Sequence, residues 1–234
     1  MSLMESGSVS QALPESRAAF IRKTYLHVAL AVGLFVLAEV LLWGSPIHQK
    51  ILELVSSSQY AWLGVLAAFM LIGWLARSLA ANVRSQGMQY LGLALYVVAQ
   101  AIIFLPLITL ALIAAPEGTL LKQALVVTGF LFTGLTAVVL FTRRDFSFLR
   151  TGLMVGGFVA LGLIIAGSVF GFNLGLAFSG GMILLASGAI LYDTSKVLHH
   201  YPEDAHVGAA LEIFASIALL FWYVLQFIIS MNRD

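Results

Sequence analysis

The sequence lacks cysteine altogether and has few charged residues. The absence of cysteine excludes disulfides, thiolate metal sites and cysteine nucleophiles. Charged residues make up 10% of the 234 positions, against about 25% in an ordinary soluble domain. The formal net charge is +1, and no basic cluster interleaved with aromatic residues is present. This balance argues against nucleic acid or another polyanion as a partner.

What the sequence does contain is apolar material spread along almost its whole length. Hydrophobic residues account for 61% of the chain and fall in runs of about 20 residues, the length that a helix needs to cross a bilayer. A membrane β-barrel would instead show short alternating segments. We therefore predict an all-α polytopic membrane protein, a bundle of seven transmembrane helices, at residues 20–43, 60–80, 88–114, 120–142, 148–170, 174–198 and 207–231.

Two domains follow from this pattern: a tail and a membrane domain over residues 20–231. The tail begins at Met1, ends at Ala19, is polar and rich in serine, and does not resemble a signal peptide. We predict that it is flexible and cytoplasmic. With this orientation the inner segments hold nine basic residues, Arg17, Arg22, Lys23, Arg77, Arg84, Arg143, Arg144, Arg150 and Lys196, and the outer ones hold three, Lys50, Lys122 and Arg233. The positive-inside rule then places the carboxyl terminus on the outer, periplasmic side.

Asp193 is the most informative single residue. It lies inside the sixth predicted span, about one and a half turns from the polar end formed by Lys196, His199 and His200. A charged group at that depth costs roughly 2.5–3.5 kcal/mol on insertion scales, so it usually faces partner helices or water and is functional.

Two other charged residues are expected at a similar depth on the inner side. Glu212 lies about five residues into the seventh span, where it can face Asp193 and share a proton or a cation with it, or extend to the headgroups. Arg77, near the end of the second span, is the best candidate to pair with Asp193. It can equally be an ordinary anchor in the lipid headgroups.

Catalysis and cofactor binding find little support. His199, His200 and His206, with Glu203 and Asp204, match no ligand spacing and are interpreted as a solvated loop. Serines of the last two spans lack a membrane histidine positioned to activate them. We predict that the protein is not an enzyme and has no cofactor.

Three segments of the fourth to sixth predicted spans carry further information: GLTAVVLF at 134–141, TRRDFSFL at 142–149 and SGAILYDTS at 187–195. In this order and spacing they resemble the Bax-inhibitor family of seven-helix membrane proteins. The resemblance places the membrane aspartate of the family on Asp193 and its basic residue of the second helix on Arg77. It implies a pH-sensitive calcium leak, in which Asp193 is a possible calcium contact and its pairing with Arg77 is broken on protonation.

The sequence departs from this pattern on the last helix. Ser216 stands where the family's second aspartate is expected, and Leu219 where an asparagine is expected. Glu212, one turn earlier on the same face, is the nearby acid that can substitute. With a serine at this position and a polar tail, the sequence is similar to the bacterial branch of the family, whose members modulate an FtsH-type ATP-dependent protease. The resemblance therefore implies a modulator of the bacterial inner membrane that binds this protease and exposes its tail to it, with the calcium leak as the alternative.

Overall fold

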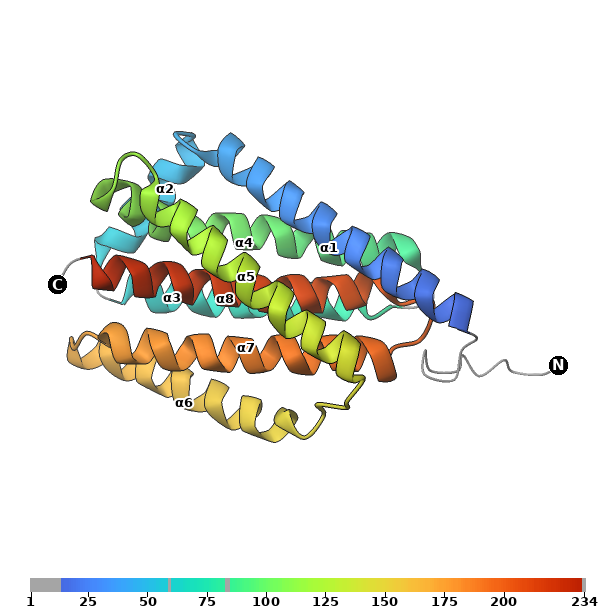
Figure 1. The fold of residues 1–234 in the computed structure, drawn as a ribbon. Helices are drawn as coiled ribbons and strands as arrows, with labels where there is room; N and C mark the ends of the chain where they lie inside the picture. Colours follow the sequence, from blue (N-terminus) through green and yellow to red (C-terminus); the bar gives the residue numbers. More distant parts are fainter. Residues whose placement is uncertain (1–13, 59, 83–84, 233–234) are drawn as a thin grey trace.

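The structure is a computed structural model that describes residues 14–58, 60–82 and 85–232. This part of the chain forms eight helices (Figure 1): α1 (Pro14–Leu42), α2 (Pro46–Ser57), α3 (Ala61–Ala80), α4 (Gln86–Ala114), α5 (Thr119–Thr142), α6 (Leu149–Phe170), α7 (Gly175–His199) and α8 (His206–Met231). The two termini lie at opposite ends of the bundle in Figure 1. We call the end at which α1 and α8 begin the N-side.

Seven of the helices, all except α2, are long and apolar enough to cross a membrane, which confirms the predicted seven-helix bundle. α2 is an additional short helix between the first two predicted spans. It begins where Ser45 accepts a hydrogen bond from the His48 amide at 3.2 Å and where proline occupies the first turn. α1 begins at Pro14, inside the segment predicted to be a tail. Residues 1–13 lie outside the described residues.

α4 and α8 form the centre of the bundle, and α8 packs against α1, α3, α4, α5 and α7. Their contact is built from aromatic rings: Phe104 stacks on Phe221 with 5.7 Å between ring centroids and meets Trp222 edge-on at 5.0 Å. Lipid tails are as apolar as these side chains, so the hydrophobic effect gives little drive for helix association in a membrane. Close van der Waals packing of the rings supplies the stability instead.

α6 lies at the edge of the bundle and packs mainly against α7 (Figure 1). The contact uses small residues: Leu185 reaches the space over Gly156, and Leu153 lies 3.2 Å from where a Cβ at Gly188 would stand.

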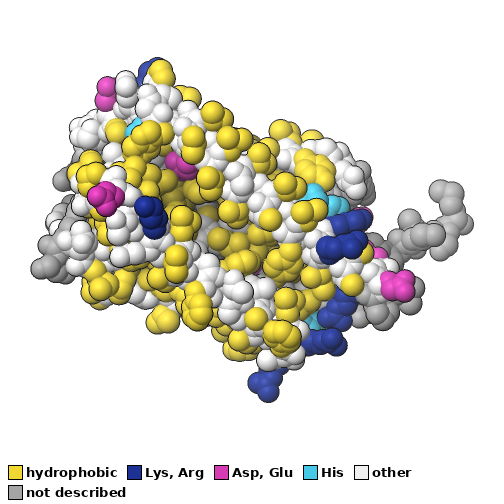
Figure 2. All heavy atoms as spheres, turned by 45° about the horizontal axis from the view of Figure 1, so that its top comes forward, with side chains coloured by type: hydrophobic (Ala, Val, Ile, Leu, Met, Phe, Trp, Pro, Cys, Tyr) yellow, Lys and Arg dark blue, Asp and Glu magenta, His cyan; other side chains and the backbone are white. Residues whose placement is uncertain are grey.

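Basic side chains gather at the N-side on the face shown in Figure 2, whereas the middle of that face is covered by hydrophobic side chains. The separation is the one expected of a protein whose middle lies in acyl chains and whose ends lie in headgroups. The cytoplasmic location of the N-side stays a prediction from this charge bias. The same view shows a hollow in the apolar face between α1 and α5.

Two glycines allow the last turn of α3 to lie directly on its neighbours. A Cβ at Gly92 of α4 would stand 2.5 Å from the Ala76 carbonyl oxygen, and one at Gly208 of α8 would stand 2.8 Å from the Ala80 carbonyl oxygen. Backbone atoms cannot move aside as a flexible side chain can. Both positions therefore require glycine, and together they determine where the end of α3 lies.

We predict that Gly92→Ala lowers the stability of the folded protein by about 1–3 kcal/mol, the usual effect of overpacking. The measurement is thermal unfolding in mild detergent. Gly129→Ala on α5 is the matched control, because nothing lies within 4 Å of its Cβ position and alanine favours the helix. Equal melting temperatures for the two variants would contradict the close approach.

Candidate functional site

Arg77 is held by α3 at the point where that helix meets α4 and α8. Its Nε lies 3.4 Å from Glu212 Oε2 on α8, and its Nη2 lies 3.4 Å from the Tyr96 hydroxyl on α4. The guanidinium carbon stands 5.2 Å from the centre of the Tyr96 ring, a cation–π distance. A guanidinium has five N–H donors, and these contacts occupy two nitrogens. The Arg77 side chain remains 44% exposed.

Asp193 on α7 meets α8 through Ser216, whose hydroxyl donates a hydrogen bond to Asp193 Oδ2. Ser216 and Glu212 are four residues apart on α8, so they share one face of the helix. The charges of Glu212, Lys196 and Arg77 all act on Asp193. The site is therefore a cluster from three helices, in which one arginine and two carboxylates interact inside the bundle.

Two cavities meet at this cluster. The larger has a volume of about 1160 Å³ and extends from Arg77, Asp193 and Glu212 past Phe104 to Gln226 near the far end of α8. The smaller has a volume of about 270 Å³, lies at the N-side, and is lined by the same Arg77 and Glu212 together with Lys196, His200 and Tyr201. The ion pair of Arg77 and Glu212 thus forms the border between the two spaces.

The sequence-predicted residues Arg77, Asp193, Glu212 and Ser216 all come together here, but their pairing differs from the expectation. Arg77 forms its ion pair with Glu212, and within the described residues no direct ion pair joins it to Asp193. The reason is geometric: Ser216 takes one oxygen of Asp193, while Glu212 reaches Arg77 directly. Asp193 is partly buried and lines the cavity at the end where it meets Arg77 and Glu212.

Sequence reasoning missed Tyr96. This side chain is 4% exposed and contacts Arg77 through both its hydroxyl and its ring. Nothing in the sequence distinguishes Tyr96 from the other tyrosines in the spans, because its role arises only where α3 lies against α4. The two cavities could not be predicted from the sequence either, because hydrophobic periodicity does not show where neighbouring helices diverge.

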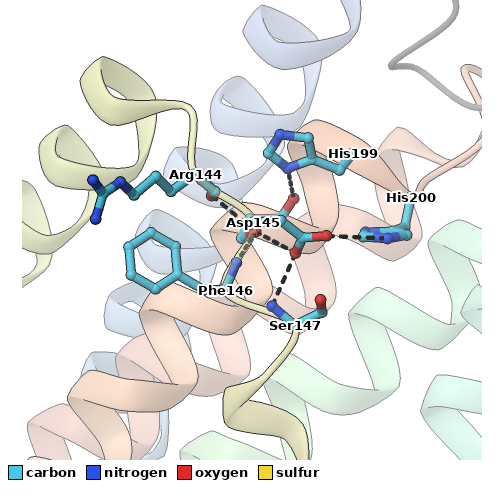
Figure 3. Close-up of polar contacts among 7 residues, drawn as sticks. Arg144, Asp145, Phe146, Ser147, His199 and His200 are labelled. Carbon is cyan, nitrogen blue, oxygen red and sulfur yellow. Dashed lines mark hydrogen bonds and ion pairs between the residues drawn. The ribbon is translucent and has the colours of Figure 1, made fainter.

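The loop between α5 and α6 is fastened to α7 close to Asp193 (Figure 3). Ser195, fully buried, accepts a hydrogen bond from the Phe146 amide at 2.9 Å and lies 3.3 Å from Asp145 Oδ1. Asp145 also accepts from the Ser147 amide at 2.9 Å and lies 3.7 Å from His200 Nε2. The Ser147 amide is the main cause that holds the pKa of Asp145 below its ordinary value.

The remaining histidines have partners other than a metal. His199 donates from Nδ1 to the Ser195 carbonyl oxygen at 2.9 Å, and His27 lies 2.9 Å from the Tyr90 hydroxyl and 4.9 Å from the His206 ring. In the part of the chain that the structure describes, no three His, Asp or Glu side chains come together as a group that would hold a metal ion.

Seven spans around a charged cluster between two cavities define a polytopic membrane protein with an ionic site inside its helical bundle. The profile of the family described as "Inhibitor of apoptosis-promoting Bax1" matches residues 17–234. The chain belongs to this Bax-inhibitor family, which confirms the resemblance carried by the three segments.

Individual relatives come from both bacteria and a mammal. An uncharacterised protein of Pseudomonas aeruginosa is 36% identical over 122 residues, 52% of this chain and 54% of that protein. The Modulator of FtsH protease YccA of Escherichia coli K12 is 34% identical over 123 residues, 52% of this chain and 56% of YccA. Protein lifeguard 4 of Mus musculus is 29% identical over 115 residues, 49% of this chain and 48% of that protein. The chain thus spans about half the length of the curated relatives it matches.

We predict that Ser195→Ala releases the loop between α5 and α6. Amide hydrogen exchange of Phe146 and Ser147 should accelerate roughly fivefold, the effect of losing one hydrogen bond worth about 1 kcal/mol. Ser187→Ala, about two turns earlier on α7, is the control and should leave this exchange unchanged. An unaltered rate in Ser195→Ala would show that the loop is held by other contacts.

The loop should also respond to acid. Because the folded pKa of Asp145 is lowered, its contacts stabilise the loop above the ordinary aspartate range near pH 4, and this contribution is lost as pH falls through the lower folded value. The absence of cysteine permits a single spin label at Arg144→Cys. Its spectrum should stay constant from neutral pH to the ordinary range and become mobile below it, whereas Asp145→Asn should be mobile throughout.

Proposed function

We propose that this protein modulates membrane-protein quality control in a bacterial inner membrane by binding an FtsH-type ATP-dependent protease. The observation that carries the proposal is the 34% identity to a protein named for that modulation. The seven candidate spans support the proposal, because a membrane-anchored protease and its membrane partner meet in a shared bilayer. The proposed contact uses the N-side, where basic side chains gather and where the loop between α5 and α6 is fastened in one conformation.

The tail, from Met1 to Ala19, is the proposed handle for degradation. α1 is described from Pro14, so a truncation of residues 2–13 leaves every described helix intact. The same bundle end then presents both the binding surface and the handle. In this arrangement a protease that engages the N-side reaches the tail first and must extract seven spans to continue, which makes the chain a slow substrate.

The test compares turnover of the full chain with that of a variant lacking residues 2–13, in cells with active or inactivated protease. Truncation should slow degradation several-fold and abolish its dependence on the protease. A scrambled tail of equal composition is the control: it should be degraded as the natural tail is, if only an extended polar segment is needed. Two results together would refute the proposal: the full chain does not copurify with inactive protease in mild detergent, and the truncated chain is degraded at an unchanged rate.

A second candidate function is a pH-sensitive calcium leak, favoured by the two cavities that meet at Arg77 and Glu212. In this proposal the ion pair closes the passage between the large cavity and the N-side. Asp193 adds a second negative charge next to the pair. Protonation of Asp193 removes that charge and leaves the Ser216 hydroxyl without a charged acceptor, so the hold between α7 and α8 weakens.

Calcium flux into reconstituted vesicles measures this. Flux should rise as pH falls, at most by about tenfold per pH unit, because a single titrating carboxylate governs it. Asp193→Asn should conduct without pH response. Glu53→Gln, an exposed acid on α2, is the control and should keep the response of the parent chain. Flux equal to that of empty vesicles at every pH would end the leak proposal and leave protease modulation unaffected.

A further inference from the structure

The large cavity is bounded by helices that do not close over it. α3 packs against α2, α4 and α8, whereas α7 packs against α5, α6 and α8. Both helices line the cavity, and α4 and α8 lie between them. Trp74 and Met70 belong to its lining on the α3 side and are 70% and 49% exposed. The cavity is therefore a groove with an exposed rim, and in a bilayer that rim faces the acyl chains.

The walls of this groove are largely apolar over most of its length. Rings and aliphatic side chains line it, among them Trp62, Phe69, Phe104, Leu107, Phe178 and Trp222. Its volume, about 1160 Å³, exceeds the range of about 300–1,000 Å³ found for small-molecule pockets. Water is poorly accommodated by an apolar wall of this kind, while hydrocarbon is available along the whole rim. An aliphatic chain is the occupant that matches both the lining and the surroundings.

The N-side end of the groove has the opposite chemistry. The small pocket that shares Arg77 and Glu212 with the groove adds two further basic side chains, Lys196 and His200. Lys196 Nζ stands 5.3 Å from the centre of the Tyr201 ring, at a cation–π distance. Arg77 retains donors beyond its contacts with Glu212 and Tyr96. Glu212 and Asp193 lie close to Arg77, and Asp145 lies 3.7 Å from His200. Within the described residues Lys196 forms no ion pair, so Lys196 and the remaining Arg77 donors are the groups available to an anionic oxygen. Guanidinium and ammonium groups both bind phosphate well.

A basic pocket joined to an apolar groove matches an amphiphile. We propose that this chain binds one glycerophospholipid of the leaflet at the N-side, with its phosphate against Arg77 and Lys196 and its acyl chains in the groove between α3 and α7. The lipid closes the open side of the bundle, and its phosphate meets Arg77 donors other than those that contact Glu212 and Tyr96. This inference does not depend on the protease proposal. It shares the large cavity and Arg77 with the leak proposal, but its test measures lipid binding and not calcium flux.

The binding experiment uses the full chain, delipidated in detergent, and native mass spectrometry with defined lipids. Phosphatidylglycerol and phosphatidylethanolamine should each give a one-to-one complex. Diacylglycerol with the same acyl chains, which lacks the phosphate, should bind at least about tenfold more weakly, the loss expected for one charge-assisted hydrogen bond. Equal binding of diacylglycerol would overturn the phosphate site.

Variants locate the lipid. Ala189→Trp fills the groove from α7, where Ala189 is part of the lining, and should abolish the complex. Ala177→Trp, on the exposed face of the same helix, is the matched control. Lys196→Gln should weaken phosphatidylglycerol about tenfold and leave diacylglycerol unchanged, whereas Lys122→Gln at the opposite end should change neither. Equal lipid binding by the two tryptophan variants would refute the proposal. If Ala189→Trp does not fold, the two lysine variants supply the test: equal affinities of Lys196→Gln and Lys122→Gln for phosphatidylglycerol would refute it.

Discussion

The ion pair between Arg77 and Glu212 is the interaction on which the rest of this site depends. A guanidinium and a carboxylate within membrane helices are costly unless they satisfy each other, and removal of one leaves the other charge stranded. The pair joins α3 to α8, and Tyr96 of α4 supports the arginine from the side. Three of the seven spans are therefore tied together through one side chain, at the border of two cavities.

Backbone packing, not side-chain length, brings this arginine into place. Gly92 and Gly208 allow the last turn of α3 to touch the backbones of α4 and α8, and Arg77 then lies within reach of Glu212 and Tyr96. α8 is the common partner, since it also carries Ser216 and so reaches Asp193 on α7. A change in charge at Asp193 therefore acts on α8, the helix whose Glu212 forms the ion pair with Arg77.

The three proposed roles, lipid binding, cation passage and contact with a protease, use different parts of the same arrangement. A groove open on one side suits a lipid chain, and a charged border between two spaces suits regulated passage of a cation. The fastened loop at the N-side suits contact with a protein partner. Ser195 connects that loop to α7 two residues beyond Asp193, so the loop and the site inside the bundle are linked through α7. A lipid phosphate bound to Arg77 would share the guanidinium with Glu212 and would therefore influence the border itself.

Composition and run length alone determined the all-α class, the seven spans and the charge asymmetry, because a bilayer admits only helices or closed barrels and requires about twenty apolar residues for each crossing. The depth of Asp193, Arg77 and Glu212 also followed from counting residues along predicted helices. The pairing of these three residues could not be predicted from the sequence. It depends on how α3, α7 and α8 are rotated about their axes, because this rotation decides whether Asp193 or Glu212 reaches Arg77. α2, the role of Tyr96, the groove between α3 and α7 and the link from Ser195 to the loop depend on which helices touch and which diverge. Only tertiary packing decides this, because contacts between distant segments leave no period in the sequence.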